Sequence, residues 1–351
     1  MKTCIQWLSV LLTVGILLML PSCGGKESAG AYADSVFTGM DTVITLRLAA
    51  DGVDNTVLGN ASAGAEKIVQ DLEKILSCHD ETSELYALNR DVHLLINADE
   101  TLLSVWNTAC NMYELTDGAY DPTLGALTDL WNVGGGGPVP KEEAIAEAML
   151  HMGPDKLTVE GTTITKNDTA LQIDLGGVGK GYALQEVLSW LSATEIPYGL
   201  VSMGGNIGVF GQKPDGTPYQ IGIKDPHDTG TIVGYLYIPS GFVSVSGNYE
   251  RFFRQEGVVY HHILDPFTGR PADSGIASVA VYTQNGAAAD ALSTALFVMG
   301  VEKGMALYEN GQVSFEAVFI TEDNRILLTP GLTEDGRFEM TSRDYTLAAA
   351  E

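Results

Sequence analysis

Basic residues are scarce in this sequence. Its 351 residues include 19 Lys and Arg against 45 Asp and Glu, which gives a formal net charge of −26 at pH 7. Proteins bind nucleic acids through basic patches that meet the phosphates, so this balance argues against nucleic acid as a main partner. Charged residues make up only 18% of the chain and hydrophobic residues 45%. This composition is typical of a packed globular protein and excludes a disordered acidic tail.

The sequence also lacks an apolar run long enough for an ordinary membrane-spanning helix. The run from Ile5 to Leu20 covers about 16 residues, short of the ~20 that a span needs. Lys2 precedes it and Pro21-Ser22-Cys23 follows it, a pattern typical of an export signal. The segment resembles a bacterial lipoprotein signal, which implies cleavage before Cys23 and lipidation of that cysteine. We therefore expect a signal peptide at 1–22, a lipidated cysteine with a flexible tether at 23–34, and export to the periplasmic or extracytoplasmic face of a bacterial membrane.

Cysteine is rare as well, with four in the chain. Cys4 lies in the expected signal and Cys23 would carry the lipid, which leaves Cys78 and Cys110 in the mature domain. Two thiols in an exported protein can form a disulfide, but two separate buried thiols fit the sequence equally well. Neither cysteine has the spacing of a metal or redox motif.

Hydrophobic periodicity predicts helices and strands mixed along the chain. Helices are expected at 61–76, 100–116, 141–152 and 286–299, a loop at 134–137, and a glycine-rich turn entering a helix at 176–191. Strands are expected at 36–48, 157–159, 162–166 and 170–174, with several more between 198 and 260. No repeat or linker interrupts the pattern. The expected fold is therefore α+β with a mixed sheet, in one intertwined unit over 35–345; two domains divided near Gly134 are the alternative.

Three common nucleotide and hydrolase motifs are missing: the P-loop, the Rossmann fingerprint and the Gly-x-Ser-x-Gly elbow. In their place, the segment 174–183 puts four glycines and Lys180 at the expected start of a helix. The N-terminus of a helix suits a phosphate, and a lysine adds a cation for its charge. A tight strand-to-helix turn explains the same glycines without a ligand.

A second cluster of polar residues lies on the expected helix near the C-terminus. Asp290 and Thr294 are four residues apart, so their oxygens lie on one helix face, where Ser293 can join them. Carboxylate and hydroxyl oxygens are hard ligands that suit Mg²⁺. An aspartate that merely caps the helix is the alternative.

The neighbouring His261 and His262 precede a turn at Asp265-Pro266. Adjacent residues of a strand point to opposite faces, so only one of the two can face a given site. A histidine there can act as a general base near neutral pH, although a surface pair is also consistent with the sequence.

Taken in order, these segments resemble the ApbE family of FAD:protein FMN transferases over nearly all of the mature chain. The segments that carry the resemblance are Met40-Asp41-Thr42, 76–77 with 83–85 and Asn89, 116–123, 174–183, Gly204-Gly205-Asn206, 246–249, 262–266 with 268–269, and 290–294. The family implies Mg²⁺-dependent transfer of the FMN part of FAD to a Thr or Ser hydroxyl of an acceptor flavoprotein, with release of AMP. Asp41 departs from the glycine that is commoner in the family.

The resemblance also implies roles for single residues. His262 is implied as the catalytic base, Cys23 as the lipidation site, and Gly177, Asp290, Ser293 and Thr294 as the surroundings of Mg²⁺. FAD contacts are implied at Met40, His79, Ala119, Tyr120, Asp121, Asp174, Lys180 and Leu264, of which position 79 is often aromatic in relatives. Acceptors in the family carry a Ser/Thr-Gly-Ala-Thr motif. This sequence contains no such run, so the expected substrate is another protein, such as a membrane-associated flavoprotein of electron transport.

Two other functions are compatible with the same residues. The first is a metal-dependent FAD pyrophosphatase, in which water takes the place of the acceptor hydroxyl and FMN and AMP are released. The second is a non-enzymatic FAD-binding lipoprotein that stores or delivers the flavin. No residue supports a link to thiamine synthesis.

Overall fold

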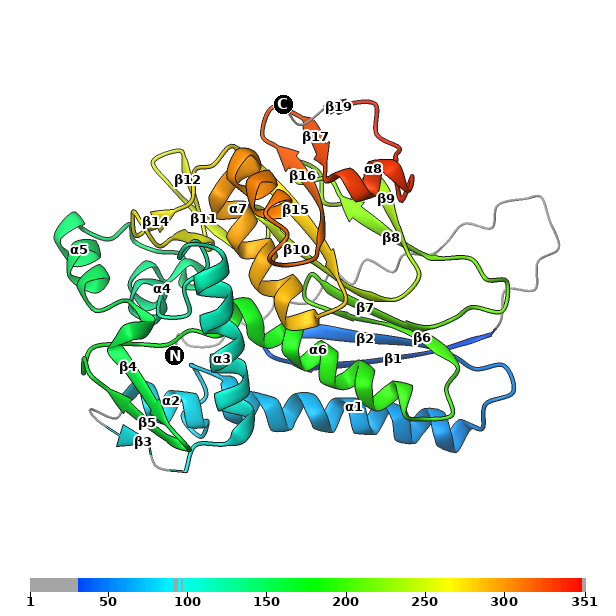
Figure 1. Ribbon diagram of the computed structural model, residues 1–351, viewed down its shortest axis with the longest axis horizontal. Helices are drawn as coiled ribbons and strands as arrows, with labels where there is room; N and C mark the ends of the chain where they lie inside the picture. Colours follow the sequence, from blue (N-terminus) through cyan, green and yellow to red (C-terminus); the bar gives the residue numbers. More distant parts are fainter. Residues whose placement is uncertain (1–30, 91–93, 96, 349–351) are drawn as a thin grey trace, which may run out of the picture. The chain divides into compact units, whose positions relative to one another are not determined.

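The computed structural model describes residues 31–90, 94–95 and 97–348, which form one compact unit (Figure 1). The expected signal peptide at 1–22, the expected lipidation site Cys23 and the tether up to position 30 lie outside these residues. Within the described part of the chain, no helix is both long and apolar enough to cross a membrane.

The centre of the fold is a nine-stranded mixed sheet in the order β1-β2-β6-β7-β10-β15-β16-β17-β19. Neighbouring strands are antiparallel except β17 and β19, which are parallel. The strands are β1 (Tyr32–Gly39), β2 (Thr42–Ala49), β6 (Tyr198–Met203), β7 (Asn206–Gly211), β10 (Gly241–Gly247), β15 (Ile276–Thr283), β16 (Glu316–Thr321), β17 (Arg325–Leu328) and β19 (Thr346–Ala348). The mixed α and β fold expected from the sequence is confirmed.

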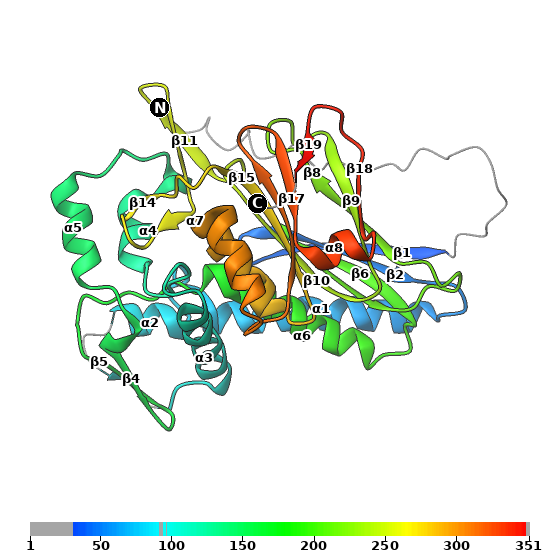
Figure 2. The same ribbon diagram turned by 45° about the horizontal axis from the view of Figure 1, so that its top comes forward.

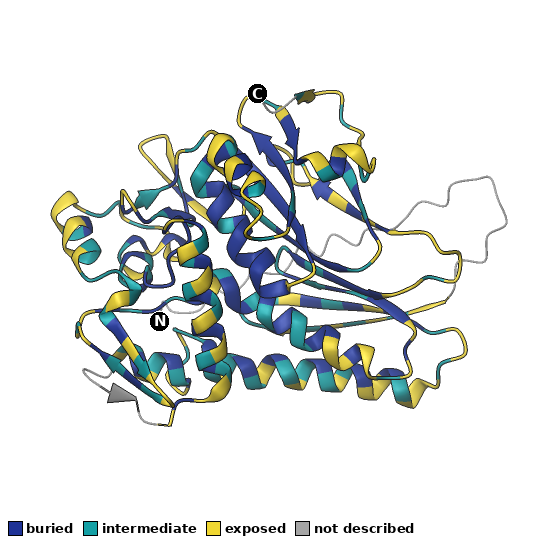
Figure 3. Cartoon of the chain, viewed as in Figure 1, coloured by how far each residue is buried: buried dark blue, intermediate teal, exposed yellow. Residues whose placement is uncertain are grey.

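Three long helices cover one face of this sheet: α1 (Asn55–Leu76), α6 (Gly176–Ser192) and α7 (Gly286–Glu309) (Figures 1 and 2). A second sheet, with the order β18-β9-β8, and the short helix α8 (Pro330–Glu334) pack on the other face. Its strands are β8 (Tyr219–Lys224), β9 (Ile232–Ile238) and β18 (Phe338–Met340). Strand β15 is therefore buried on both faces, with Val279 and Val281 in the helical layer's core and Ala280 and Tyr282 in the other (Figure 3).

A mainly helical region flanks the α1–α6–α7 layer at one end (Figure 1). It contains α2 (Glu84–Arg90), α3 (Glu100–Leu115), α4 (Gly125–Trp131), α5 (Glu142–Leu150) and the small sheet β3 (Leu94–Leu95), β5 (Thr163–Lys166) and β4 (Leu157–Glu160). Two ribbons follow β10 in the chain: β11 (Phe252–Gln255) with β12 (Val258–His261), and β13 (Leu264–Asp265) with β14 (Arg270–Pro271). Trp131 packs with Phe253 and Leu264, so this small core ties α4 to both ribbons.

The strand expected at 36–48 is in fact a hairpin of β1 and β2. Gly39 pairs with Thr42, which leaves Met40 and Asp41 as a two-residue turn with φ of 50° and 56°. Positive φ at both central residues is what a type I′ hairpin turn requires, and aspartate tolerates it better than most residues. Strand β1 begins at Tyr32, so the folded unit starts inside the tether expected at 23–34. At its other end β19 extends past the expected boundary at 345.

The strand expected at 170–174 does not form. The side-chain amide of Asn89 holds this segment instead, because it donates to the Ile173 carbonyl and accepts from the Ile173 N–H, both at 2.8 Å. A side chain thus makes the two hydrogen bonds that a neighbouring strand would make. The expected glycine-rich turn is also shorter than expected, since α6 begins at Gly176 itself.

We expect Gly181→Ala to destabilise the fold. A Cβ at this position would lie 2.1 Å from the Gly286 carbonyl oxygen and 2.7 Å from Asp290 Cβ, so α6 and α7 would have to separate. Overpacking of this kind costs about 1–3 kcal/mol in unfolding free energy. Chemical denaturation followed by circular dichroism measures it. Gly59→Ala on α1 is the matched control: nothing lies within 4 Å of its Cβ position, so it should stabilise by roughly 0.5–1 kcal/mol. Equal stability of the two variants would contradict the packing argument.

Candidate functional site

The site is organised around the point where the first turns of α6 and α7 touch. Gly181 and Gly286 face each other there, and a Cβ on either residue would lie within 2.5 Å of the other's carbonyl oxygen. Only glycine allows this approach. Asp290, one turn further along α7, is thereby brought to the N-terminal turns of α6.

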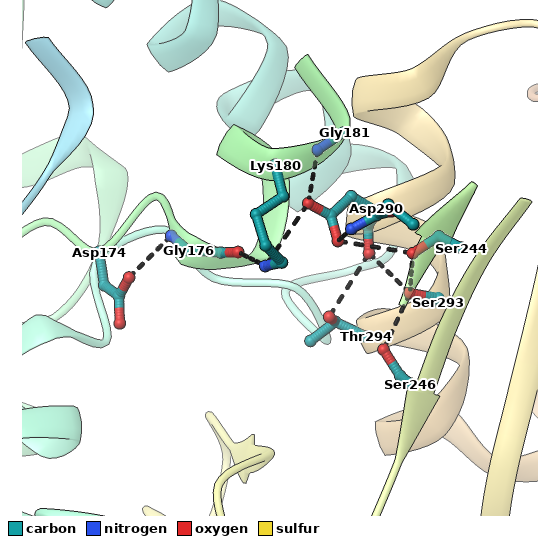
Figure 4. A network of polar contacts seen from close by, with 10 residues as sticks. Asp174, Gly176, Lys180, Gly181, Ser244, Ser246, Asp290, Ser293 and Thr294 are labelled. Carbon is teal, nitrogen blue, oxygen red and sulfur yellow. Dashed lines mark hydrogen bonds and ion pairs between the residues drawn. The ribbon is translucent and has the colours of Figure 1, made fainter. Parts of the chain in front are cut away.

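Asp290 is almost fully enclosed, with 5% of its surface exposed. Its Oδ2 accepts a hydrogen bond from the Gly181 N–H at 2.9 Å, and its Oδ1 accepts one from the Asn206 side chain at 3.1 Å (Figure 4). The Lys180 ammonium lies 3.9 Å from Oδ2. The Ser244 hydroxyl also donates to Oδ1, at 3.5 Å. The carboxylate is therefore fixed in orientation by three neutral donors, and it has one cation within ion-pair distance in the described part of the chain.

The hydroxyls of α7 differ in their availability. Ser293 is fully buried, and its Oγ contacts Ser244 Oγ at 3.0 Å, Ser246 Oγ at 2.8 Å and the Asp290 carbonyl at 2.9 Å. Thr294 is half-buried, and its Oγ1 lies 3.6 Å from the position of a Cβ on Gly177. Asp290, Thr294 and Gly177 thus lie around one spot, whereas Ser293 is turned into the contact between α7 and β10.

The start of α6 carries the cation of the site. Lys180 Nζ donates to the Gly176 carbonyl at 2.6 Å while it lies beside Asp290 (Figure 4). Asp174 accepts from the Gly176 N–H at 2.8 Å and from the Thr128 hydroxyl at 3.0 Å, so it fixes the entry to the helix. A helix N-terminus with an adjacent ammonium is an arrangement that favours an anionic ligand.

Tyr120 contributes a hydroxyl that is buried and has no hydrogen-bond partner among the described residues. Burial raises its pKa, and the charges of Asp174, Asp290 and Asp121 raise it further. The hydroxyl therefore stays protonated and can donate one hydrogen bond. A buried donor without a partner is rare in proteins, which favours a ligand as its acceptor.

The Asp121 side chain makes hydrogen bonds within its own loop. It accepts from the Thr123 N–H at 2.7 Å and from the Thr123 hydroxyl at 2.5 Å, while burial raises the pKa of its carboxyl. The preceding Ala119 is 4% exposed. Both residues hold the backbone on which Tyr120 is presented.

His261 ends β12 and His262 follows it, and the two rings contact different carbonyls. His261 is buried, and its Nε2 donates to the Ala272 carbonyl at 3.0 Å. His262 Nδ1 lies 3.3 Å from the Arg251 carbonyl, which can only accept, so Nδ1 carries the proton and Nε2 has the lone pair. Burial lowers the pKa of His262 to about 4. The ring is therefore neutral near pH 7 and can accept a proton at Nε2.

The remaining residues with implied ligand contacts lie in different surroundings. His79 and Asp174 line the same small recess, together with Cys78, and both Cys78 and Cys110 are unpaired thiols. The side chain of Leu264 belongs to the small core around Trp131, so only its backbone is free to meet a ligand.

Met40 lies in the β1–β2 turn, where its N–H donates to Glu73 Oε1 at 3.1 Å. The same turn approaches the loop before β7, because a Cβ on Gly204 would lie 2.7 Å from Thr42 Oγ1. That loop leads directly into Asn206, which binds Asp290. Met40 is thus connected to the site through the backbone of two turns.

Sequence reasoning assigned no role to Glu250 or to the amide side chain of Asn206. Glu250 Oε1 lies 3.2 Å from the position of a Cβ on Gly205. The side chain reaches solvent, yet so much of its surroundings is protein that desolvation raises the pKa of its carboxyl to about 7, against the opposing charge of Lys180. Glu250 directly follows the segment 246–249, and this position was the feature of the sequence that could have indicated a place near the site.

Comparison with known proteins gives the family of this chain. The family model described as "ApbE family" matches residues 40–319. The chain is 31% identical to the FAD:protein FMN transferase of Treponema pallidum over 96% of this chain and 98% of the relative, and 34% identical to that of Vibrio cholerae over 74% and 79%.

Solved structures give the same result. The flavin transferase ApbE from Vibrio cholerae has a TM-score of 0.76 at 27% identity, and the ApbE protein from Thermotoga maritima has one of 0.77 at 31%. Each comparison covers 87% of this chain and 99% of the other. The expected family is therefore confirmed by sequence and by fold.

We expect the imidazole of His262 to stay neutral throughout the range from pH 8 to pH 5. Desolvation disfavours the charged ring, so its midpoint should lie well below the usual value near 6.5. Two-dimensional NMR of the six histidine rings measures these midpoints, and His262→Gln identifies the signal. The chemical shifts should also report a proton on Nδ1. A midpoint above 6 would contradict the buried, neutral base.

Proposed function

The chain belongs to the ApbE family, and on that basis we propose that it transfers the FMN part of FAD to a Ser or Thr hydroxyl of another protein and releases AMP. The observation that carries this proposal is the meeting of three functions in one site. Lys180 at the start of α6 lies 3.9 Å from the Asp290 carboxylate. Burial lowers the pKa of His262 most, and the charges of Arg251, His261 and Lys180 lower it further, so the ring is within electrostatic range of this lysine.

The residues present fit the Mg²⁺ that we propose as the cofactor. Asp290, the Thr294 hydroxyl and the Gly177 carbonyl are hard oxygen donors of the kind that Mg²⁺ prefers, and Asp290 Oδ2 keeps a lone pair beyond its hydrogen bond from the Gly181 N–H. The combined charge of Asp121, Asp174 and Asp290 around Tyr120 also favours a bound cation. Ser293 is omitted from this ligand set because its hydroxyl is enclosed by three other oxygens.

When bound, Mg²⁺ would neutralise phosphate charge and polarise a phosphoryl oxygen. The chain's own residues orient and move the proton. Lys180 binds the pyrophosphate at the start of α6, and the Tyr120 hydroxyl donates one further hydrogen bond. The acceptor hydroxyl gives its proton to Nε2 of His262 as its oxygen bonds to the phosphorus of the FMN half. The bond between that phosphorus and the bridging oxygen breaks, and the bridging oxygen leaves with AMP.

Export and lipid anchoring through Cys23 are part of the same proposal. They are supported by the leader sequence alone, namely the basic start, the short apolar run and the cysteine that follows it. An acceptor exposed on the same side of the membrane would then be within reach of the tethered enzyme. The absence of a Ser/Thr-Gly-Ala-Thr run in the chain supports transfer to a separate protein.

The proposed reaction predicts metal-dependent labelling of an acceptor. The purified protein is incubated with FAD, Mg²⁺ and an acceptor domain that carries a Ser/Thr-Gly-Ala-Thr motif, and the acceptor is analysed by intact mass. A mass gain equal to FMN minus water, lost when EDTA is added, is the expected result. Free FMN and AMP without labelling would identify a pyrophosphatase. Bound but intact FAD, with or without Mg²⁺, would identify a carrier.

Asp290→Ala should slow transfer by about 10²–10³-fold at limiting Mg²⁺, because it removes a charged ligand from a site that stabilises developing phosphate charge. The loss should shrink as the Mg²⁺ concentration rises. Initial rates over a Mg²⁺ titration measure both effects. Glu195→Ala, which removes an exposed carboxylate in the loop before β6, is the control and should retain the wild-type rate. Unchanged transfer by Asp290→Ala at limiting Mg²⁺ would refute the assignment.

A further inference from the structure

The two ends of the ribbon β11–β12 lie next to each other at His262, the proposed general base. Arg251 precedes β11 and His262 follows β12. The Arg251 carbonyl accepts hydrogen bonds from both the backbone N–H and the Nδ1 of His262, at 3.1 and 3.3 Å. Any protein whose hydroxyl reaches His262 must therefore approach the base of this ribbon.

The two faces of the ribbon differ in their contacts. On one face, Phe253 stacks on its cross-strand partner Tyr260 with ring centroids 5.2 Å apart, and Tyr260 packs against Trp131. The other face contains Phe252 at one position and the pair Arg254 and Val259 at the next, since cross-strand partners share a face. The first face is fixed to the small core. On the second face His261, the partner of Phe252, is buried against Phe297, whereas Phe252, Arg254 and Val259 are exposed.

The exposed residues of the second face, Phe252, Arg254 and Val259, are apolar or basic, although the protein as a whole is strongly acidic. Phe252 is 43% exposed and Val259 is 39% exposed, and the Arg254 guanidinium lies 5.7 Å from the Phe252 ring centre. Within the described residues, neither Arg251 nor Arg254 has a carboxylate within ion-pair distance. Basic residues are outnumbered more than two to one by acidic ones in this chain. Arg251 acts electrostatically on the neighbouring Glu250, whereas Arg254 on the exposed face has no ion pair among the described residues and favours a segment with acidic residues.

The ribbon also offers backbone hydrogen bonds. Among the described residues it contains two strands, and no third strand pairs with either of its edges. Figures 1 and 2 show the ribbon standing out from the layer of α7, and Figure 3 shows its tip as exposed. A free strand edge accepts an extended segment of another protein through main-chain hydrogen bonds, while side chains on the face give selectivity.

We propose that the outer face of β11–β12, formed by Phe252, Arg254 and Val259, is the docking surface for the acceptor protein, which binds it through an extended segment with acidic and apolar residues next to the hydroxyl. This inference rests on the proposed function and specifies where its protein substrate binds. Phe267 lies in the turn between β13 and β14. It is 61% exposed and its ring lies 3.7 Å from the Cβ position of Gly118, next to Ala119 and Tyr120.

The test is a kinetic comparison with the acceptor domain used above. Phe252→Ser, Val259→Ser and Arg254→Glu should each raise the KM for the acceptor tenfold or more, with kcat at saturating acceptor and the affinity for FAD within twofold of wild type. Val36→Ser on β1, where the side chain is 65% exposed, and Lys303→Glu on the exposed side of α7 are the matched controls and should leave KM unchanged. An unchanged KM in the three ribbon variants would overturn the proposal.

A second measurement separates this proposal from the reaction itself. A photo-crosslinking phenylalanine analogue at position 252 should capture the acceptor domain, and the same analogue at position 36 should not. Capture without labelling by the wild type would support the docking surface and refute the transfer reaction. Labelling without capture, or ribbon variants that change only the binding of anionic lipid vesicles or the oligomeric state, would refute the docking surface and leave the reaction intact.

Discussion

The contact between Gly181 and Gly286 is the constraint on which the rest of the site depends. Two helices that meet without any intervening side chain can share backbone and carboxylate groups directly, so that the N–H of Gly181 reaches Asp290. Asp290 in turn holds Asn206 at the start of β7 and lies beside Lys180. One close approach thus aligns two helix starts and one strand. The hydrophobic layer of α1, α6 and α7 on the sheet supplies the rigidity that keeps it.

The site holds a positive charge at Lys180, although the protein as a whole is strongly negative. A protein with a net charge of −26 repels a dinucleotide at long range. The site answers this locally, with Lys180 at a helix start and, in the proposed function, a divalent cation at Asp290. Burial keeps two ionisable groups of the site uncharged. It keeps the Tyr120 hydroxyl protonated and the His262 ring uncharged, so one remains a donor and the other an acceptor.

The spacing of residues along the sequence correctly predicted those elements whose structure depends on nearby residues. The helix expected at 100–116 forms over Glu100–Leu115 because its apolar residues recur at helical spacing, and the spacing of Asp290 and Thr294 on α7 was equally readable. The failures have non-local causes. Residues 170–174 are held by Asn89, far away in the sequence, and alternation alone could not reveal the turn that divides the strand expected at 36–48. Glu250 gains its perturbed pKa from surroundings that only the fold assembles.

In the proposed reaction, the Arg251 carbonyl connects the base His262 with the surface that we propose for the acceptor. This carbonyl fixes the tautomer of the ring, because a proton on Nδ1 leaves Nε2 as the nitrogen that can accept one. The same residue opens the ribbon that we propose as the docking surface. A segment added to that ribbon would therefore be held by backbone that also orients the base. A protein acceptor gains binding energy from this backbone through its extended segment, whereas a water molecule has no such segment. This difference gives a physical reason why the hydroxyl of a protein would be favoured over water in the proposed reaction.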